Sequence, residues 1–173
     1  MNELAFLSPG LASADGGFEP VQRSPLERAL RAAPLSVRDL SLTGKLEVRG
    51  GLEVRGGLDG LELSGGAEAI AITPDRALVL CPPEDVDRHL RELRAQARSA
   101  VDVTSALAGI EVTGERLLRR LTDLDLEALP AVGAVARVPA TVLRHENEFR
   151  IFFPQEYADY LAEVVLDTIV GLG

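Results

Sequence analysis

The stretch that decides the fold occupies residues 39–50 and reads Asp39-Leu40-Ser41-Leu42-Thr43-Gly44-Lys45-Leu46-Glu47-Val48-Arg49-Gly50. A second version follows residue 100, with Asp102-Val103-Thr104 leading to Ile110-Glu111-Val112-Thr113-Gly114. Both versions alternate apolar and polar residues, which predicts strands with one buried face. The repeat indicates two halves of similar order, at about 23–99 and 100–173.

The two halves also share a pattern further along. Leu80-Cys81-Pro82-Pro83-Glu84 has its echo in Phe152-Phe153-Pro154-Gln155-Glu156. In each case proline stops an apolar strand and a helix is predicted to follow. We therefore expect an α+β fold of two pseudo-repeated halves, with antiparallel or mixed sheets flanked by helices.

Turn residues and periodicity predict the remaining elements. The helix-start signature Ser24-Pro25-Leu26-Glu27 predicts a short helix over 24–33. Further helices are expected over 84–98, 115–121 and 156–170, and strands over 37–49, 52–64, 67–73, 77–81 and 100–113, with a hairpin over 134–153. Residues 1–22 lack sustained periodicity and are expected to form a flexible tail. The hexapeptide of residues 46–51 is copied at 52–57, which indicates a local duplication, because a solenoid needs more repeats.

Composition excludes several classes of protein. The chain has 173 residues, 46% of them hydrophobic, which suits one folded domain rather than a disordered chain. A net charge of −9 gives no drive toward nucleic acid or anionic membranes. The single cysteine cannot form an internal disulfide, and neither a signal peptide nor a run of about 20 apolar residues is visible. We expect a soluble, cytoplasmic protein.

The side chains that could carry chemistry do not assemble into a catalytic motif. His89 and His145 lack ligand-spaced neighbours, and Cys81 follows an apolar run that favours an inert, buried thiol. Asp123, Asp125 and Glu127 alternate with leucines; they could act as acid and base or bind a cation, but a solvated face with inward leucines is favoured. We expect no catalytic residues and no metal site.

One surface feature is a candidate for binding a partner. Arg88, Arg91, Arg94 and Arg98 form a stripe on one flank of the helix predicted over 84–98. The stripe could contact an acidic partner, or it could simply be solvated and balanced by acidic neighbours on the same helix.

The residues 39–50 and their second version resemble the opening signature of the glycine-cleavage T-protein (aminomethyltransferase) superfamily. Within that superfamily the chain is most similar to the gamma-subunit family of heterotetrameric sarcosine oxidase. Supporting segments follow in family order, namely Arg23-Ser24-Pro25-Leu26, Thr73-Pro74-Asp75-Arg76-Ala77-Leu78-Val79, Phe149-Arg150-Ile151-Phe152-Phe153 and Tyr157-Ala158-Asp159-Tyr160-Leu161. The resemblance covers residues 23–170 and implies a single T-protein-like domain over 23–173 with a ferredoxin-like, aminomethyltransferase-like fold.

The resemblance also implies a function, namely that of an accessory, non-catalytic subunit of a flavoenzyme that oxidatively demethylates sarcosine or a related secondary amine in one-carbon metabolism. FAD, FMN, NAD and tetrahydrofolate would then be bound by larger alpha- and beta-like subunits, and zinc by a small delta-like subunit. The alternative is a stand-alone folate-binding aminomethyltransferase-like protein. Its motivation is the T-protein-like stretch that begins Leu121-Thr122-Asp123, with Asp102 and Asp123 as candidate pterin contacts.

Overall fold

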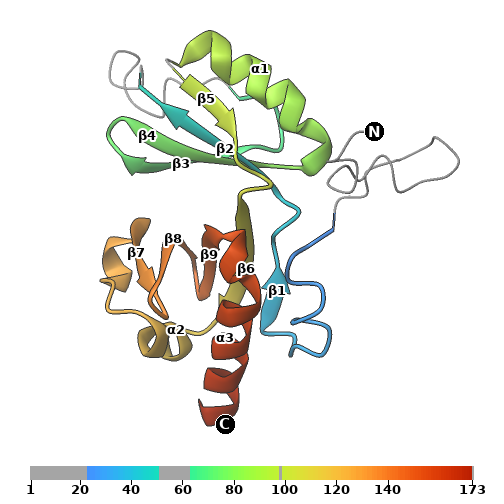
Figure 1. Cartoon of the computed structure of the whole chain (residues 1–173). Helices are drawn as coiled ribbons and strands as arrows, with labels where there is room; N and C mark the ends of the chain where they lie inside the picture. The colour runs from blue at the N-terminus through green and yellow to red at the C-terminus, as the bar shows by residue number, and fades with distance from the viewer. Residues whose placement is uncertain (1–22, 51–62, 98, 173) are drawn as a thin grey trace, which may run out of the picture.

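The computed structural model describes residues 23–50, 63–97 and 99–172. Within these residues the chain forms two antiparallel sheets and three α-helices (Figure 1). The α+β class and the antiparallel sheets predicted from the repeat are therefore confirmed. The predicted tail over 1–22 and Arg98 lie outside the described residues. So does the strand predicted over 52–64, with the second hexapeptide copy at 52–57, except for residues 63 and 64, which form no strand.

The smaller sheet has four strands in the order β3-β4-β2-β5. These strands are β2 (Gly44–Arg49), β3 (Glu68–Thr73), β4 (Arg76–Cys81) and β5 (Ser99–Asp102). One face of this sheet is covered by α1 (Val86–Gln96), which buries Leu93 against Leu46, Val48 and Val79. The predicted hairpin of β3 and β4 and the predicted apolar stripe of α1 are both present.

The larger sheet has five strands in the order β1-β6-β9-β8-β7. These are β1 (Val37–Asp39), β6 (Leu107–Thr113), β7 (Ala131–Val135), β8 (Val138–His145) and β9 (Glu148–Pro154). Helices α2 (Glu115–Leu121) and α3 (Ala158–Leu172) pack on one face, where the largest apolar cluster includes Leu118, Phe149 and Leu161.

The two sheets meet through their other faces. Leu78 and Leu80 of β4 form a buried cluster with Leu143 of β8 and Phe152 of β9. The layers in space are therefore α1, the four-stranded sheet, the five-stranded sheet and the pair α2 and α3, with the contact between the two sheets in the middle (Figure 1).

Each half of the chain gives its first strand to the other half's sheet. β1 pairs with β6 in the five-stranded sheet, with Val37 opposite Val112, before the chain crosses to β2. β5 pairs with β2 in the four-stranded sheet, with Val101 opposite Glu47, before the chain crosses back to β6. Two crossing segments, residues 40–43 and 103–106, thus run between the sheets.

Four predicted elements differ from the structure. The strand predicted over 37–49 is divided into β1 and β2 by the first crossing segment. Residues 25–32 form turns rather than a helix, although the Leu26 amide donates to Ser24 Oγ at 3.0 Å as a cap would. The strand predicted over 100–113 is interrupted by the second crossing segment. The region 134–153 holds two hairpin turns instead of the one predicted. One joins β7 to β8 through Ala136 and Arg137, and the other joins β8 to β9 through residues 146–147. No helix in the described part of the chain is long and apolar enough to cross a membrane.

Candidate functional site

The two crossing segments lie side by side and are tied together by equivalent backbone hydrogen bonds. The Leu40 amide donates to the Gly109 carbonyl at 2.8 Å, and the Val103 amide donates to the Lys45 carbonyl at 2.9 Å. In the aligned repeats Leu40 corresponds to Val103, and Lys45 to Gly109. The sequence repeat is therefore a structural one, with pseudo-twofold symmetry at the crossing.

The hydroxyl groups of the repeats follow the same symmetry. Ser41 Oγ accepts from the Gly109 amide at 3.2 Å, and Thr104 Oγ1 accepts from the Lys45 amide at 3.0 Å. Each hydroxyl residue is preceded by an aspartate whose Oδ1 accepts its amide at 2.8 Å, Asp39 for Ser41 and Asp102 for Thr104. The Asp-x-Ser/Thr motif thus builds two short turns that position the crossing segments.

Lys45 occupies the centre of this crossing and is completely buried. Its ammonium group donates to the carbonyl oxygens of Ser41 and Thr43, both at 2.7 Å. Burial lowers the pKa of Lys45 from 10.5 to about 8, although Asp102 and Asp39 favour its charged form. These two hydrogen bonds fix the backbone of the first crossing segment around the Lys45 ammonium group.

The role of Lys45 as a structural centre was not predicted from the sequence. Two signals could have found it: it is the only lysine among 18 basic residues, and it replaces the glycine of the second repeat. Lys45 has a long side chain where the equivalent residue of the second repeat, Gly109, has none. This difference indicates a contact in the first half that the second half does not make.

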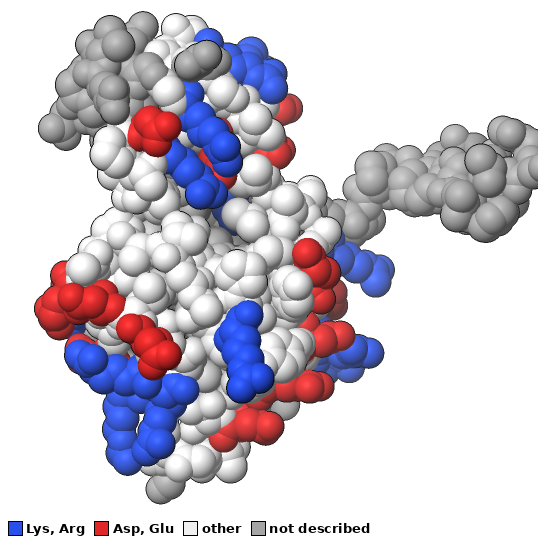
Figure 2. Space-filling view, turned by 60° about the vertical axis from the view of Figure 1, so that its left-hand side comes forward, with Lys and Arg blue, Asp and Glu red and all other residues white. Residues whose placement is uncertain are grey.

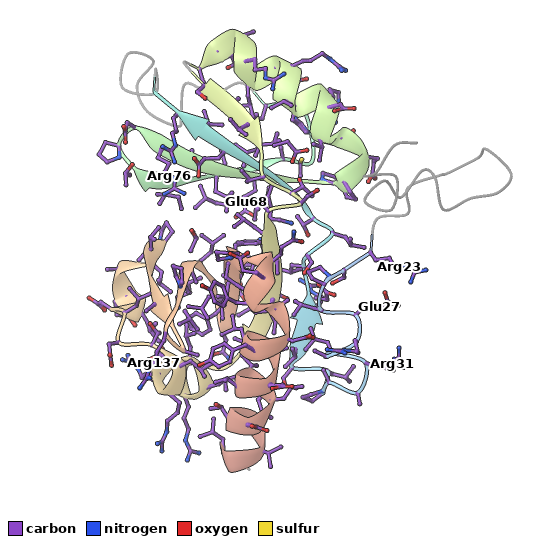
Figure 3. The ribbon with its side chains drawn as sticks, in the orientation of Figure 1. Arg23, Glu27, Arg31, Glu68, Arg76 and Arg137 are labelled. Carbon is purple, nitrogen blue, oxygen red and sulfur yellow. The ribbon has the colours of Figure 1, made fainter. Side chains whose placement is uncertain are left out.

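A glutamate from each repeat is held by two arginines. Glu111 of β6, nearly buried, pairs with Arg38 at 2.6 Å and with Arg150 at 3.0 Å. Arg150 also reaches Glu68 on β3 at 2.8 Å, so it links the five-stranded sheet to the four-stranded sheet. Figure 3 shows Glu68 between the two sheets.

The equivalent glutamate of the first repeat is Glu47 of β2. It pairs with Arg49 and with Arg76, each at 2.6 Å. Burial by itself would raise the pKa of Glu47, but the hydrogen bonds from Arg49 and Arg76 outweigh burial and hold that pKa below its ordinary value.

Two cavities flank the crossing, one on each side. An open cleft of about 470 Å³ lies beside the first crossing segment and is lined by Arg38, Asp39, Leu42, Glu68, Cys81 and Arg150, among others. A smaller cavity of about 210 Å³ lies beside the second segment, between Arg76 of β4 and Val132 of β7. Its lining is mainly apolar, with Glu47 and Arg76 as its charged residues.

The charged groups of the larger cleft are engaged with each other rather than directed at a ligand. Arg38 and Arg150 are neutralised by Glu111 and Glu68, and Asp39 accepts from Ser24 and Ser41. Cys81 is 3% exposed, which confirms the predicted burial, and burial raises the pKa of its thiol. Among the described residues this arrangement favours a rigid junction over a nucleophile with its base.

The two candidate folate contacts lie in different parts of the fold. Asp102 ends β5 in the four-stranded sheet, while Asp123 follows α2 on the lobe of the five-stranded sheet. Both are exposed, and neither lines the two cavities beside the crossing.

The other acidic and histidine candidates have structural contacts. Asp125 Oδ1 accepts from the Glu127 amide and begins a short 3-10 turn, and Glu127 pairs with Arg144 at 3.0 Å. Leu121 and Leu126 point inward while the three carboxylates are exposed, as the alternation predicted. Nowhere in residues 23–50, 63–97 and 99–172 do three or more potential ligands gather for a metal ion.

The two histidines have different environments. His89 is buried and its Nδ1 lies 3.1 Å from Glu92, whereas His145 is exposed at the end of β8.

The arginines proposed as a partner surface have different environments. Arg88 pairs with Asp85 at 2.8 Å, and Arg94 Nε donates to the Ala100 carbonyl at 3.3 Å. Arg91 is exposed.

No protein-family model matches the chain, and no curated protein matches its sequence. Solved structures do match its fold. A chain of heterotetrameric sarcosine oxidase from Corynebacterium sp. U-96 superposes with a TM-score of 0.69 at 17% identity, covering 87% of this chain and 95% of that chain. The glycine cleavage system aminomethyltransferase T from Bartonella henselae gives a TM-score of 0.55 at 16% identity, covering 82% of this chain. The alignment spans about half of that transferase, 48% of its length. At these identities the likeness is one of fold.

Proposed function

We propose that this chain is an accessory, non-catalytic gamma-like subunit of a heterotetrameric sarcosine-oxidase-type flavoenzyme. The observation that carries the proposal is the match over nearly the full length of both chains, 87% of this one and 95% of the sarcosine oxidase chain. The transferase match covers 48% of that protein, which fits a subunit better than a complete transferase. In this proposal the pseudo-repeated halves follow the ferredoxin-like, aminomethyltransferase-like arrangement.

The chemistry of the crossing supports a scaffolding role. Lys45, Glu47 and Glu111 each have their hydrogen-bonding and charge partners within the chain. Groups that must bind a reacting molecule are instead expected to converge on an accessible pocket. FAD, FMN, NAD and tetrahydrofolate would accordingly be held by larger alpha- and beta-like subunits, and the reaction would be the oxidative demethylation of sarcosine or a related secondary amine.

Purification of a tagged copy of the full chain from its native cells tests the proposal. We expect larger chains to copurify together with flavin absorbance, and the complex to oxidise sarcosine or another secondary N-methyl amine. Because obligate interfaces bury upward of about 2,000 Å², the complex should survive size-exclusion chromatography. A colourless single chain that remains monomeric would contradict the proposal.

The alternative, a stand-alone folate-binding protein, would use Asp102 or Asp123, which are both exposed but lie in different parts of the fold. Thermal denaturation with tetrahydrofolate distinguishes it, since ligand at ten times its dissociation constant stabilises by about 1.4 kcal/mol. A shift that is lost in Asp102→Asn or Asp123→Asn would support this alternative. No shift at millimolar ligand would end it.

A further inference from the structure

Three exposed arginines gather at the end of the five-stranded lobe. Arg116 and Arg120 lie one helical turn apart on α2, and Arg137 lies in the turn between β7 and β8. The turn is tied to the end of this helix, because the Ala136 amide donates to the Leu121 carbonyl at 2.6 Å. Figure 2 shows positive side chains collected at this end, and Figure 3 places Arg137 beside α2. We call these three residues the cationic cluster.

The acidic residues nearby are used by other arginines. Glu115 pairs with Arg119 at 2.6 Å and with Arg144 at 3.4 Å, and Glu127 pairs with Arg144 at 3.0 Å. Within the described residues, none of the three arginines of the cationic cluster has an ion pair or a side-chain hydrogen bond. The cluster is therefore a positive surface whose arginines have no ion pair among the described residues, on a chain whose net charge is −9.

The turn that carries Arg137 is an unusual one for its sequence. Ala136 and Arg137 have φ angles of 48° and 68°, and they form the two-residue loop that closes the pair Val135–Val138. Such loops strongly favour Asn-Gly, because positive φ is costly for residues with a Cβ. Tyr160 Oη and the Leu121 carbonyl fix the turn by hydrogen bonds to Ala136, at 3.0 and 2.6 Å. An arginine held in a strained position without an internal partner suggests that its side chain serves a contact outside the chain.

We propose that the cationic cluster is a docking surface for an acidic segment of a partner protein. Arginine binds carboxylates through paired hydrogen bonds, and three arginines suit a short run of Asp and Glu. A long polyanion such as nucleic acid fits less well, because it would extend past the three arginines over exposed carboxylates such as Asp123 and Asp125. A short acidic segment can end within the cationic cluster and avoid them. The proposal stands independently of the flavoenzyme assignment.

Fluorescence anisotropy with labelled decaglutamate as the probe tests the proposal on the full chain. We expect binding that weakens with added salt, and that becomes at least about tenfold weaker in the triple variant Arg116→Gln/Arg120→Gln/Arg137→Gln. The matched control is Arg23→Gln/Arg28→Gln/Arg31→Gln, which removes three exposed arginines that lie together elsewhere in the described chain, one of them (Arg28) paired with Asp159, and should bind as the wild type does. An equal loss in both variants would overturn the proposal, because binding would then depend on net charge alone. So would a short single-stranded oligonucleotide that competes as well as decaglutamate does.

A single substitution at Arg137 distinguishes an effect on decaglutamate binding from an effect on the stability of the fold. Arg137→Gly removes the side chain and relieves the positive φ, so we expect the Tm to rise by roughly 2–4 °C while decaglutamate binding weakens. Glu146→Gly, at the φ of 55° in the next turn, is the matched control; it should also raise the Tm but leave binding unchanged. If Arg137→Gly raises the Tm and binding stays at the wild-type level, Arg137 is not part of the docking surface and the proposal fails.

Discussion

At the residue scale, Lys45 makes the clearest prediction about pH. Because its pKa is lowered to about 8 in the folded chain against 10.5 in the unfolded chain, the unfolded state binds more protons between these values. The contribution of Lys45 to the free energy of unfolding should therefore rise as the pH rises from about 8 to 10.5, by an amount on the order of 3 kcal/mol. Urea denaturation at several pH values measures this.

The control for that prediction is Lys45→Met, which keeps the apolar length and removes the titrating group. Cys81 acts in the opposite direction, since burial raises its thiol pKa and stability is lost as the unfolded thiol ionises. The difference between wild type and variant cancels the Cys81 contribution. A difference that stays constant from pH 7 to pH 10 would mean that the Lys45 ammonium is not desolvated as the structure shows.

At the scale of elements, the start of β2 depends on a glycine. A Cβ at Gly44 would lie 2.5 Å from Val86 Cγ2, 2.7 Å from Cys81 Sγ and 3.1 Å from the Cys81 carbonyl oxygen. Gly44→Ala should therefore push α1 away from the sheet and lower the free energy of unfolding by about 1–3 kcal/mol. Gly65→Ala is the matched control, because no atom lies within 4 Å of its added Cβ. Equal stability of the two variants by urea denaturation would contradict the packing described here.

The elements that sequence could predict are those in which local signals and burial agree. The turn of the β3–β4 hairpin lies at Thr73-Pro74-Asp75. Helix α1 follows Pro82-Pro83, and its apolar stripe ends at Leu93 and the capping residue Ala97. The helix predicted over 24–33 is wrong, although the Leu26 amide does donate to Ser24 Oγ: residues 25–32 form turns, from which Leu26 and Leu30 pack against the core of the five-stranded lobe. The β7–β8 turn was missed because Ala136-Arg137 carries no turn signal.

At the scale of the whole molecule, the exchange of β1 and β5 between sheets has no local signal. The repeat predicted two halves, yet which sheet a first strand joins is decided by pairing with residues far away in the sequence, as Val37 does with Val112 and Arg49 with Ser99. The contacts that make the exchange rigid, such as those of Lys45 and Arg150, could be seen only once the two crossing segments were placed side by side.

Arg150 provides the test of how strongly the two sheets are coupled. It contacts Glu111 within its own sheet and Glu68 on the other sheet, and Glu111 is nearly buried. Arg150→Met keeps the length of the side chain but leaves Glu111 with Arg38 alone, so we expect a loss of about 3 kcal/mol in the free energy of unfolding. The control Arg49→Met removes a more exposed partner of Glu47 and should cost under about 1 kcal/mol.

The same variant shows whether the sheets unfold as one unit. With Arg150 present, circular dichroism and tyrosine fluorescence should report a single urea transition, because the buried cluster of Leu78, Leu80, Leu143 and Phe152 joins both sheets. If this apolar cluster is sufficient by itself to couple the two sheets, Arg150→Met lowers the urea concentration at the midpoint of unfolding but keeps a single transition. If the ion pairs are needed for coupling, hydrogen exchange in Arg150→Met will show β2–β5 losing protection before β6–β9. A wild-type stability in Arg150→Met would mean that the bridge between Arg150 and Glu68 adds nothing to the junction.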